Sequence, residues 1–257
     1  QWQGHDFSMR GISSVESAII SGMAHLTSFT GTDTIPAIYQ LESSYNAKGL
    51  IGASVPATEH SVMCMGTKKA EVDTFRRLMK LYPEGILSVV SDTWNLWDVL
   101  TKYLPELKEE ILARDGKLVI RPDSGDPVDI ICGTMLPSDP DFLARKNSSE
   151  EIGVIELLWN EFGGTFNEQG YKVLDPHIGA IYGDSITRER AIAICERLKA
   201  KGFASTNVVF GIGSFTYQYN TRDTFGFAMK ATYGEITHKV SGRTLGEKTV
   251  VEAREVY

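Results

Sequence analysis

Four segments of the chain repeat one pattern, in which a β-branched, apolar run ends in glycine, serine or aspartate and leads into a polar or helical stretch. They are residues 86–92, 118–125, 178–185 and 207–214. Continuous apolar runs are typical of parallel strands that are covered on both faces. Apolar residues spaced by about 3.6 positions predict a helix after the first strand. They are Leu96, Val99, Leu100, Tyr103 and Leu104, and a second helix is predicted from Ala191 to Ala200.

These units predict a single α/β domain over residues 1–257, with a parallel, barrel-like (β/α) sheet. A doubly wound sheet fits the alternation equally well. The barrel is favoured because each predicted strand delivers its polar residues at its carboxyl end, and in a barrel these ends meet at one mouth. Segments 25–29 and 51–55 are candidates for further strands, and the pattern after Tyr233 is strand-like. Residues 133–152, rich in proline, serine and charge, predict a surface loop or insertion.

Composition narrows the class of protein. At 42% hydrophobic and 23% charged residues the chain is typical of a soluble globular protein, and a net charge of −7 argues against nucleic-acid or anionic-membrane partners. No apolar run reaches the roughly 18 residues of a membrane helix. Three widely spaced cysteines predict reduced thiols and a cytoplasmic setting. Because the chain begins with Gln1 rather than methionine, we expect it to be part of a longer protein.

Candidate phosphate and diol binders follow the predicted strands. The turn Gly211-Ile212-Gly213-Ser214 allows backbone N–H groups to approach a phosphate, although an ordinary tight turn explains it equally well. Arg121 and Asp123 place a cation and a carboxylate at one strand end, where a structural salt bridge is the alternative. Asp92 and Asp184 hold equivalent positions. Carboxylates gathered at one mouth repel each other unless a diol, Mg²⁺ or basic groups lie between them.

Other candidates are weaker on their own. His60 follows the segment 52–55, and a lone histidine is more often a hydrogen-bonded structural residue than a catalytic one. Metal binding by histidine is not expected, because no second histidine stands at ligand spacing. Asp33 lies in a polar turn, where it also suits a helix N-cap. Phe7 and Arg10 combine an aromatic ring with a cation.

Taken together and in order, these segments resemble the nicotinamide phosphoribosyltransferases, which belong to the type II phosphoribosyltransferases. The resemblance spans residues 4 to 230. The matching pieces are His5-Asp6-Phe7 with Arg10-Gly11, Gly31-Thr32-Asp33-Thr34, Ser54-Val55-Pro56-Ala57 with Glu59-His60-Ser61, Ser88-Val89-Val90-Ser91-Asp92, Arg121-Pro122-Asp123-Ser124-Gly125, Gly183-Asp184, Phe210-Gly211 and Thr221-Arg222-Asp223. Ser8 and Met9 depart from the family, which often has glycine and an aromatic residue there. The phosphate turn also carries fewer glycines than usual.

The resemblance implies a role for each matching position. Phe7 and Arg121 would sandwich a pyridine ring, and Asp33 would accept a hydrogen bond from the carboxamide of nicotinamide. His60 would be phosphorylated by ATP, with Asp92 orienting it and Glu59 beside it. Asp92 and Asp123 would lie near the ribose and Mg²⁺. Gly183, Asp184, Gly213 and Ser214 would cradle the ribose 5-phosphate, with the cations Arg222 and Lys230 near the phosphates. Ser54, Ser88 and Arg10 complete the predicted substrate-binding set.

The resemblance implies transfer of a phosphoribosyl group from phosphoribosyl pyrophosphate (PRPP) to nicotinamide, giving nicotinamide mononucleotide and pyrophosphate in the salvage of NAD. It also implies ATP as a co-substrate and a homodimer with the active site at the subunit interface. Three alternatives stay open. They are a nicotinate phosphoribosyltransferase, another barrel enzyme with a phosphorylated substrate, and a catalytically incomplete portion that only binds ligands. A carboxylate at Asp33 favours the neutral amide over nicotinate, which it would repel.

Overall fold

A computed structural model describes residues 1–141, 147–183, 185–226, 228–242 and 246–255. For residues 238–250 only the backbone is described. Within these residues six parallel strands form a curved sheet in the order β2-β1-β8-β7-β4-β3. Their bounds are β1 (Gly4–Asp6), β2 (Gly31–Thr32), β3 (Glu84–Val90), β4 (Asp115–Arg121), β7 (Ile178–Tyr182) and β8 (Val208–Ile212). The expected parallel α/β sheet is confirmed, including all four strands predicted from their apolar runs.

The segment 51–58 lies between the two edge strands of this sheet and pairs with both. Ala53 exchanges backbone hydrogen bonds with β2, through Thr32 N–H to Ala53 O at 3.0 Å and Ala53 N–H to Thr30 O at 2.8 Å. A few residues later, Ser88 N–H donates to Pro56 O at 2.9 Å and Thr58 N–H donates to Ser88 O at 3.0 Å. The parallel pairings therefore continue from β2 to β3, which favours the barrel over an open, doubly wound sheet.

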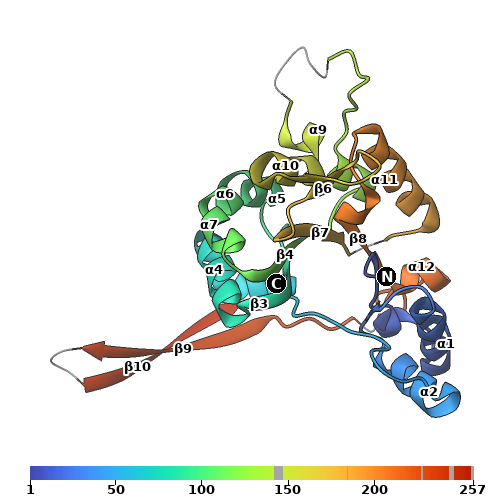
Figure 1. Cartoon of the computed structure of the whole chain (residues 1–257). Helices are drawn as coiled ribbons and strands as arrows, with labels where there is room; N and C mark the ends of the chain where they lie inside the picture. Colours follow the sequence, from blue (N-terminus) through green and yellow to red (C-terminus); the bar gives the residue numbers. More distant parts are fainter. Residues whose placement is uncertain (142–146, 184, 227, 243–245, 256–257) are drawn as a thin grey trace.

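Helices surround the sheet, and most of them follow a strand in the chain (Figure 1). The α-helices are α1 (Val15–Leu26), α2 (Ile35–Tyr45), α3 (His60–Gly66), α4 (Glu71–Leu81), α5 (Leu96–Asp98), α6 (Leu104–Glu106), α7 (Lys108–Leu112), α8 (Pro127–Cys132), α9 (Ser149–Ile152), α10 (Val154–Phe162), α11 (Arg188–Ala200) and α12 (Ser214–Gln218). A π-helical turn, Val99–Tyr103, joins α5 to α6, and short 3₁₀ turns are Met9–Gly11, Lys68–Ala70 and Ser205–Asn207. Two antiparallel pairs complete the fold, β5 (Gly164–Phe166) with β6 (Lys172–Leu174) and β9 (Tyr233–Gly242) with β10 (Gly246–Glu255).

Alternate residues of the sheet strands face two different environments. On β4, Leu118 and Ile120 are fully buried in the cluster that packs the sheet against the helices. Lys117, Val119 and Arg121 line a cavity on the other face. This alternation follows from the two-residue period of a strand. The packed core therefore lies between sheet and helices, while the inside of the curved sheet keeps room for a ligand.

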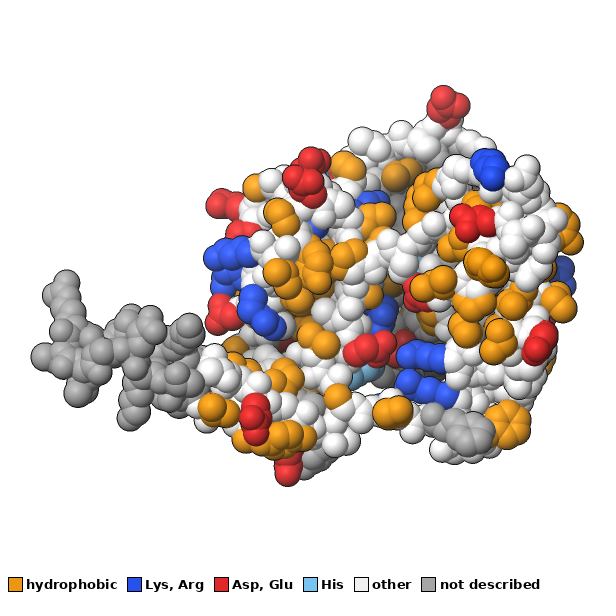
Figure 2. Space-filling model, turned by 90° about the horizontal axis from the view of Figure 1, so that it is seen from below, with side chains coloured by type: hydrophobic (Ala, Val, Ile, Leu, Met, Phe, Trp, Pro, Cys, Tyr) orange, Lys and Arg blue, Asp and Glu red, His pale blue; other side chains and the backbone are white. Residues whose placement is uncertain are grey.

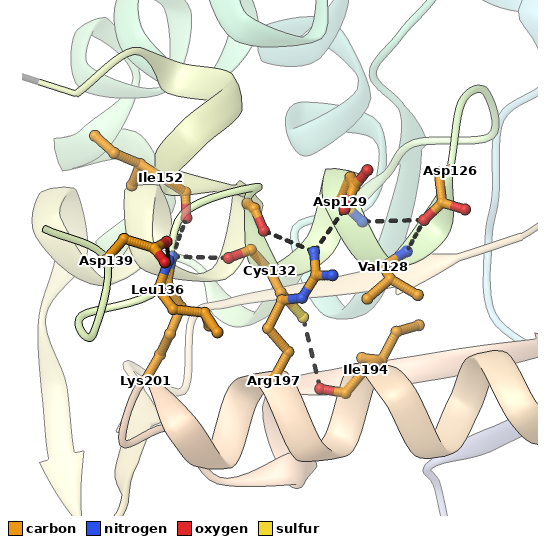
Figure 3. Close-up of polar contacts among 11 residues, drawn as sticks. Asp126, Val128, Asp129, Cys132, Leu136, Asp139, Ile152, Ile194, Arg197 and Lys201 are labelled. Carbon is orange, nitrogen blue, oxygen red and sulfur yellow. Dashed lines mark hydrogen bonds and ion pairs between the residues drawn. The ribbon is translucent and has the colours of Figure 1, made fainter. Parts of the chain in front are cut away.

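Arg197 of α11 and Lys201, which follows the last residue of this helix, fasten it to α8 and α9 (Figure 3). Arg197 Nη1 donates to Asp129 Oδ1 at 2.5 Å and to Gly133 O at 2.9 Å. Lys201 Nζ donates to the carbonyls of Cys132 and Ile152, both at 2.7 Å. Because these contacts satisfy carbonyls at the carboxyl ends of α8 and α9, they tie the ends of both helices to α11.

Several expectations need correction. Residues 25–29 are not a strand: Ser14 caps α1, which runs to Leu26, and His25 is a helical residue whose Nε2 lies 2.8 Å from Gly31 O. Segment 51–55 forms the bridging pairs described above rather than a full strand. The predicted loop 133–152 ends in α9, which Ser148 and Glu151 cap, and its residues 142–146 lie outside the described residues. After Tyr233 the expected strand pattern is confirmed as β9 and β10.

No helix in the described part of the chain is long and apolar enough to cross a membrane.

Candidate active site at the barrel mouth

The carboxyl ends of the parallel strands open onto a cavity of about 450 Å³. It is lined by Phe7, Met9, Arg10, Asp33, Glu59, Arg121, Asp123 and Gly183. Figure 2 shows one face of the molecule, with basic, acidic and histidine side chains gathered around a hollow. Seven of the site residues predicted from the sequence therefore line this cavity, although they come from distant parts of the chain. The eighth lining residue is Met9, a position at which the sequence departs from the family pattern.

Phe7 and Arg121 lie where the mouth meets a second cavity of about 500 Å³, and both line each cavity. The Phe7 ring passes so close to β8 that a β-carbon at Gly211 would lie 2.2 Å from its Cζ. Glycine at 211 is therefore required by the ring. Arg121 has a buried Nε without a hydrogen-bond partner among the described residues. An aromatic ring and a planar guanidinium suit a flat heteroaromatic ligand.

Asp33 follows β2, and two side chains contact Oδ1 of its carboxylate. His5 Nε2 lies 3.1 Å from Asp33 Oδ1, and Ser54 Oγ donates to the same atom at 2.5 Å. Burial raises the pKa of Asp33, but the hydrogen bonds from His5 and Ser54, together with the charges of His5 and Arg10, outweigh burial and leave this pKa below its ordinary value. Asp33 is therefore an ionised acceptor at the mouth.

His60 begins α3, directly after the segment that bridges β2 and β3. Its Nε2 lies 3.3 Å from Asp92 Oδ1, and Asp92 Oδ2 accepts from the backbone N–H of Asp123 at 2.8 Å. The close contact with the Asp92 carboxylate raises the pKa of His60 above its ordinary value, although burial opposes the shift. Three predicted residues thus form one chain of contacts, with Asp92 between the histidine and the loop after β4.

Two hydrogen bonds of Thr58 set the position of His60. Besides its backbone pairing with Ser88, its Oγ1 accepts from Val90 N–H at 2.9 Å. The segment that ends in His60 is thereby held along β3, and Asp92 lies two residues after the end of β3. Nothing in the sequence singles out Thr58, because a buried threonine on a bridging segment has no motif.

Glu59 lies between two arginines at the rim. Its Oε1 is 3.7 Å from Arg10 Nη1 and 3.7 Å from Arg121 Nη2. Glu59 and Arg10 are both about half exposed, so these pairs contribute little to stability. The two ion pairs hold the guanidinium groups of Arg10 and Arg121 beside the cavity, where an anionic ligand can contact them.

The remaining predicted residues are less closely gathered. Ser88 is buried, lines the second cavity, and has a hydroxyl with no hydrogen-bond partner among the described residues. Gly183 lines the mouth, where a β-carbon would lie 2.6 Å from Asp123 Oδ1. Asp184 lies outside the described residues. These positions leave Ser88 as a donor available to a ligand.

The phosphate-binding candidates after β8 do not line either cavity. Ser214 Oγ donates to Asn220 O at 2.6 Å and lies against Gly11, so its hydroxyl is already engaged. Gly213 directly precedes α12. Arg222 is half-buried next to Gly11, while Lys230 is exposed. The structure thus brings together the pyridine-binding and histidine candidates more closely than the phosphate-binding ones.

The second cavity extends from the mouth into the barrel. Its walls include Ile86, Val119, Ile181 and Val209, all inward-facing strand residues. Lys117 also lines it, and burial lowers the pKa of this lysine. The barrel interior is therefore hollow and mainly apolar below the polar mouth.

Mg²⁺ binding was predicted at Asp92 and Asp123. The described residues contain no cluster of three or more His, Cys, Asp or Glu side chains that fits a metal ion. Mg²⁺ is usually held by one or two carboxylates together with substrate phosphates, so the site does not need such a cluster. Asp123 is among the residues that line the cavity, whereas Asp92 is not. Asp123 is therefore the better fit of the two.

Comparisons with known proteins agree with this arrangement. The model of the nicotinate phosphoribosyltransferase (NAPRTase) family matches residues 2–247. A nicotinamide phosphoribosyltransferase of Acinetobacter baylyi is 57% identical over 241 residues, which are 91% of this chain and 46% of that protein. One from Mycoplasma pneumoniae is 42% identical over 253 residues, 96% of this chain and 52% of that protein. The chain spans about half the length of these relatives. It belongs to the nicotinate phosphoribosyltransferase family.

Proposed function

We propose that the protein containing this chain transfers the phosphoribosyl group of PRPP to nicotinamide, giving nicotinamide mononucleotide and pyrophosphate. The observation that carries this proposal is the ionised carboxylate of Asp33 in a cavity that Phe7 and Arg121 also line. A carboxylate accepts a hydrogen bond from a carboxamide N–H, and it repels the carboxylate of nicotinate. The names of the relatives support the same substrate.

In the proposed reaction the pyridine nitrogen attacks C1 of the ribose while the bond to pyrophosphate breaks. Neutral nicotinamide needs no general base, because its ring nitrogen already carries a free electron pair. Positioning and charge stabilisation then account for catalysis. Phe7 and Arg121 hold the ring, Asp33 sets its rotation, and Arg10 with Arg121 faces the anionic substrate.

Asp123, and secondarily Asp92, would hold Mg²⁺ together with the phosphates of PRPP. When bound there, Mg²⁺ neutralises charge that develops on the leaving pyrophosphate. Glu59 is the counter-ion of both arginines in this structure, so phosphate binding would replace a carboxylate contact with a phosphate contact.

His60 is the proposed site of phosphorylation by ATP. With the proton on Nε2, facing Asp92, the electron pair of the imidazole is on Nδ1. Nδ1 attacks the γ-phosphorus, the bond to ADP breaks, and water later hydrolyses the phosphohistidine. Asp92 stabilises the positive charge that the ring carries when Nδ1 is phosphorylated. ATP hydrolysis is thereby coupled to synthesis.

The test uses the full-length protein, PRPP and nicotinamide, with and without ATP. Wild type should form the mononucleotide, and ATP should stimulate it. Asp33→Ala should lower kcat/KM for nicotinamide by about ten-fold to a hundred-fold, as expected for a lost charge-assisted hydrogen bond. His60→Ala should abolish the stimulation by ATP and keep the basal reaction. His177→Ala, which alters a histidine paired with Asp175 before β7, should match wild type.

Failure of wild type to use nicotinamide would remove the proposal. Unchanged stimulation by ATP in His60→Ala would remove the role of His60 alone. Better turnover of nicotinate than of nicotinamide would assign the protein to the alternative activity that its family name describes. The homodimer with a shared active site and the cytoplasmic location remain predictions, tested by light scattering and by fractionation of cells.

A further inference from the structure

His5, the middle residue of β1, lines the barrel cavity on the same strand face as Phe7. The rings of His5 and Phe7 lie 6.1 Å apart with a tilt of 36°. On the neighbouring strand β2, Gly31 is the register partner of His5, and a β-carbon there would lie 2.8 Å from His5 Nδ1. The absence of a side chain at position 31 therefore makes room for the imidazole.

His5 is better fixed than the carboxylate that it contacts. Its side chain is 14% exposed, whereas the side chain of Asp33 is 50% exposed. A half-exposed aspartate without partners would rotate among several positions, and binding a ligand would have to restrict that rotation. His5 Nε2 and Ser54 Oγ, on two different segments, both contact Oδ1. These contacts restrict rotation of the Asp33 side chain before a ligand binds.

The same contacts determine which oxygen is left for a ligand. Oδ1 has two contacts, while Oδ2 accepts no hydrogen bond from the described residues. We propose that His5 is a positioning residue which, with Ser54, holds Asp33 so that Oδ2 is presented to the carboxamide of nicotinamide. His5 thereby helps to set the preference for the neutral amide over nicotinate. This inference rests on the proposed function.

The alternative for His5 is a purely structural role beside Gly31, and kinetics separate the two. His5→Phe keeps a ring of similar size and removes the donor. His5→Gln keeps an N–H donor the same number of bonds from Cα as Nε2. If His5 has only a structural role, the phenylalanine variant should keep at least as much activity as the glutamine variant. If His5 positions Asp33, the glutamine variant should keep its activity and the phenylalanine variant should lose it.

The experiment measures KM for nicotinamide, KM for PRPP and kcat in the full-length protein. His5→Phe should raise KM for nicotinamide about ten-fold. It should also reduce the ratio of kcat/KM for nicotinamide to kcat/KM for nicotinate about ten-fold. KM for PRPP should stay unchanged, because His5 does not line the mouth cavity beside Arg10 and Asp123. His5→Gln should restore KM to within about three-fold of wild type. His177→Phe is the matched control, since it removes a histidine that pairs with Asp175 at 2.7 Å, directly before β7.

Ser54→Ala provides a second test if His5→Phe does not fold, because it removes the other donor to Oδ1. It should raise KM for nicotinamide and leave KM for PRPP unchanged. Equal KM values for nicotinamide in wild type and His5→Phe, or parallel losses in both KM values, would overturn the inference while the proposed function stands. A wild type that does not use nicotinamide at all would overturn both.

Discussion

The carboxylates of Asp92 and Asp33 differ in how many of their oxygens contact other protein groups, and this difference indicates different roles. Asp92 is engaged on both oxygens, by His60 and by the backbone of Asp123. Within the described part of the chain, Asp33 is engaged on Oδ1 alone, by His5 and Ser54. A carboxylate held on both sides suits orientation of a histidine, whereas one with a remaining oxygen suits binding of a ligand.

The pair of His60 and Asp92 gives a prediction about protonation. Asp92→Asn keeps an acceptor for the backbone of Asp123 but removes the negative charge, so the pKa of His60 should fall. NMR titration of the His60 ring measures this directly. In the folded protein the pKa is raised, so stabilisation by this pair is complete below the unfolded pKa of His60 and is lost as pH rises through the folded pKa.

The loss of stability in Asp92→Asn should accordingly be larger at a pH where His60 is protonated than at pH 9, as measured by urea denaturation. The control is Asp73→Asn, since Asp73 is an exposed aspartate that pairs with Arg76. A pKa of His60 that does not change in Asp92→Asn would contradict the assigned pairing.

At the scale of elements, the bridge formed by residues 51–58 completes the barrel and delivers His60 to the mouth. It makes backbone hydrogen bonds to β2 at Ala53 and to β3 at Pro56 and Thr58. The side chain of Thr58 adds a further bond to Val90 N–H. Because His60 follows two residues after Thr58, the stability of this bridge and the position of the histidine are linked.

Thr58→Val tests that link, because it keeps the shape of the side chain and removes its oxygen. The buried Val90 N–H then loses its acceptor, which should lower the free energy of unfolding by about 1–3 kcal/mol. The same change should reduce stimulation by ATP. Thr58→Ser keeps the hydroxyl and should retain most of both properties. Equal stability of Thr58→Val and wild type in urea denaturation would show that the bridge does not depend on this bond.

The first residue of α4 gives a prediction about pH. Glu71 is 2% exposed, and burial, with the charge of Asp98, raises its pKa to about 7 although Lys68 opposes the shift. An acid whose pKa is raised on folding holds its proton more tightly in the folded protein. Stability should therefore decrease as pH rises from the unfolded pKa of about 4.5 to about 7.

Glu71→Gln should consequently raise the free energy of unfolding by about 2 kcal/mol at pH 8 and change it little at pH 4. Urea denaturation at both values measures this. Glu109→Gln, on the exposed side of α7, should show no such dependence on pH. A glutamine variant that is less stable than wild type at pH 8 would contradict the account of Glu71.

Some elements were predictable from the sequence and others were not. β3, β4, β7 and β8 are five to seven residues long and rich in apolar, β-branched residues, which gives a clear signal. β1 and β2 have three and two residues, too few for any period to show. The apolar residues of 25–29 suggested a strand, but the helix that Ser14 caps continues to Leu26. Tertiary pairing, rather than local pattern, decides such short segments.

For the whole molecule, the sequence predicted the parallel α/β class and the mouth as the place of the site. The strand-end positions of Phe7, Asp33, Arg121 and Asp123 do meet there. The hollow interior, the bridge that closes the sheet and the contact of His5 with Asp33 were not predictable. Each depends on side chains from strands far apart in the chain, and no spacing within one segment encodes it.

The proposed function requires that this mouth selects a neutral carboxamide. The most direct measurement is a competition in which the full-length protein receives PRPP, ATP and equal concentrations of nicotinamide and nicotinate. Mass spectrometry then separates the two mononucleotide products. We expect an excess of nicotinamide mononucleotide of at least about ten-fold, the factor expected from one charge-assisted hydrogen bond, and a much smaller excess in Asp33→Ala. Equal amounts of both products from wild type, or an excess of the nicotinate product, would contradict it.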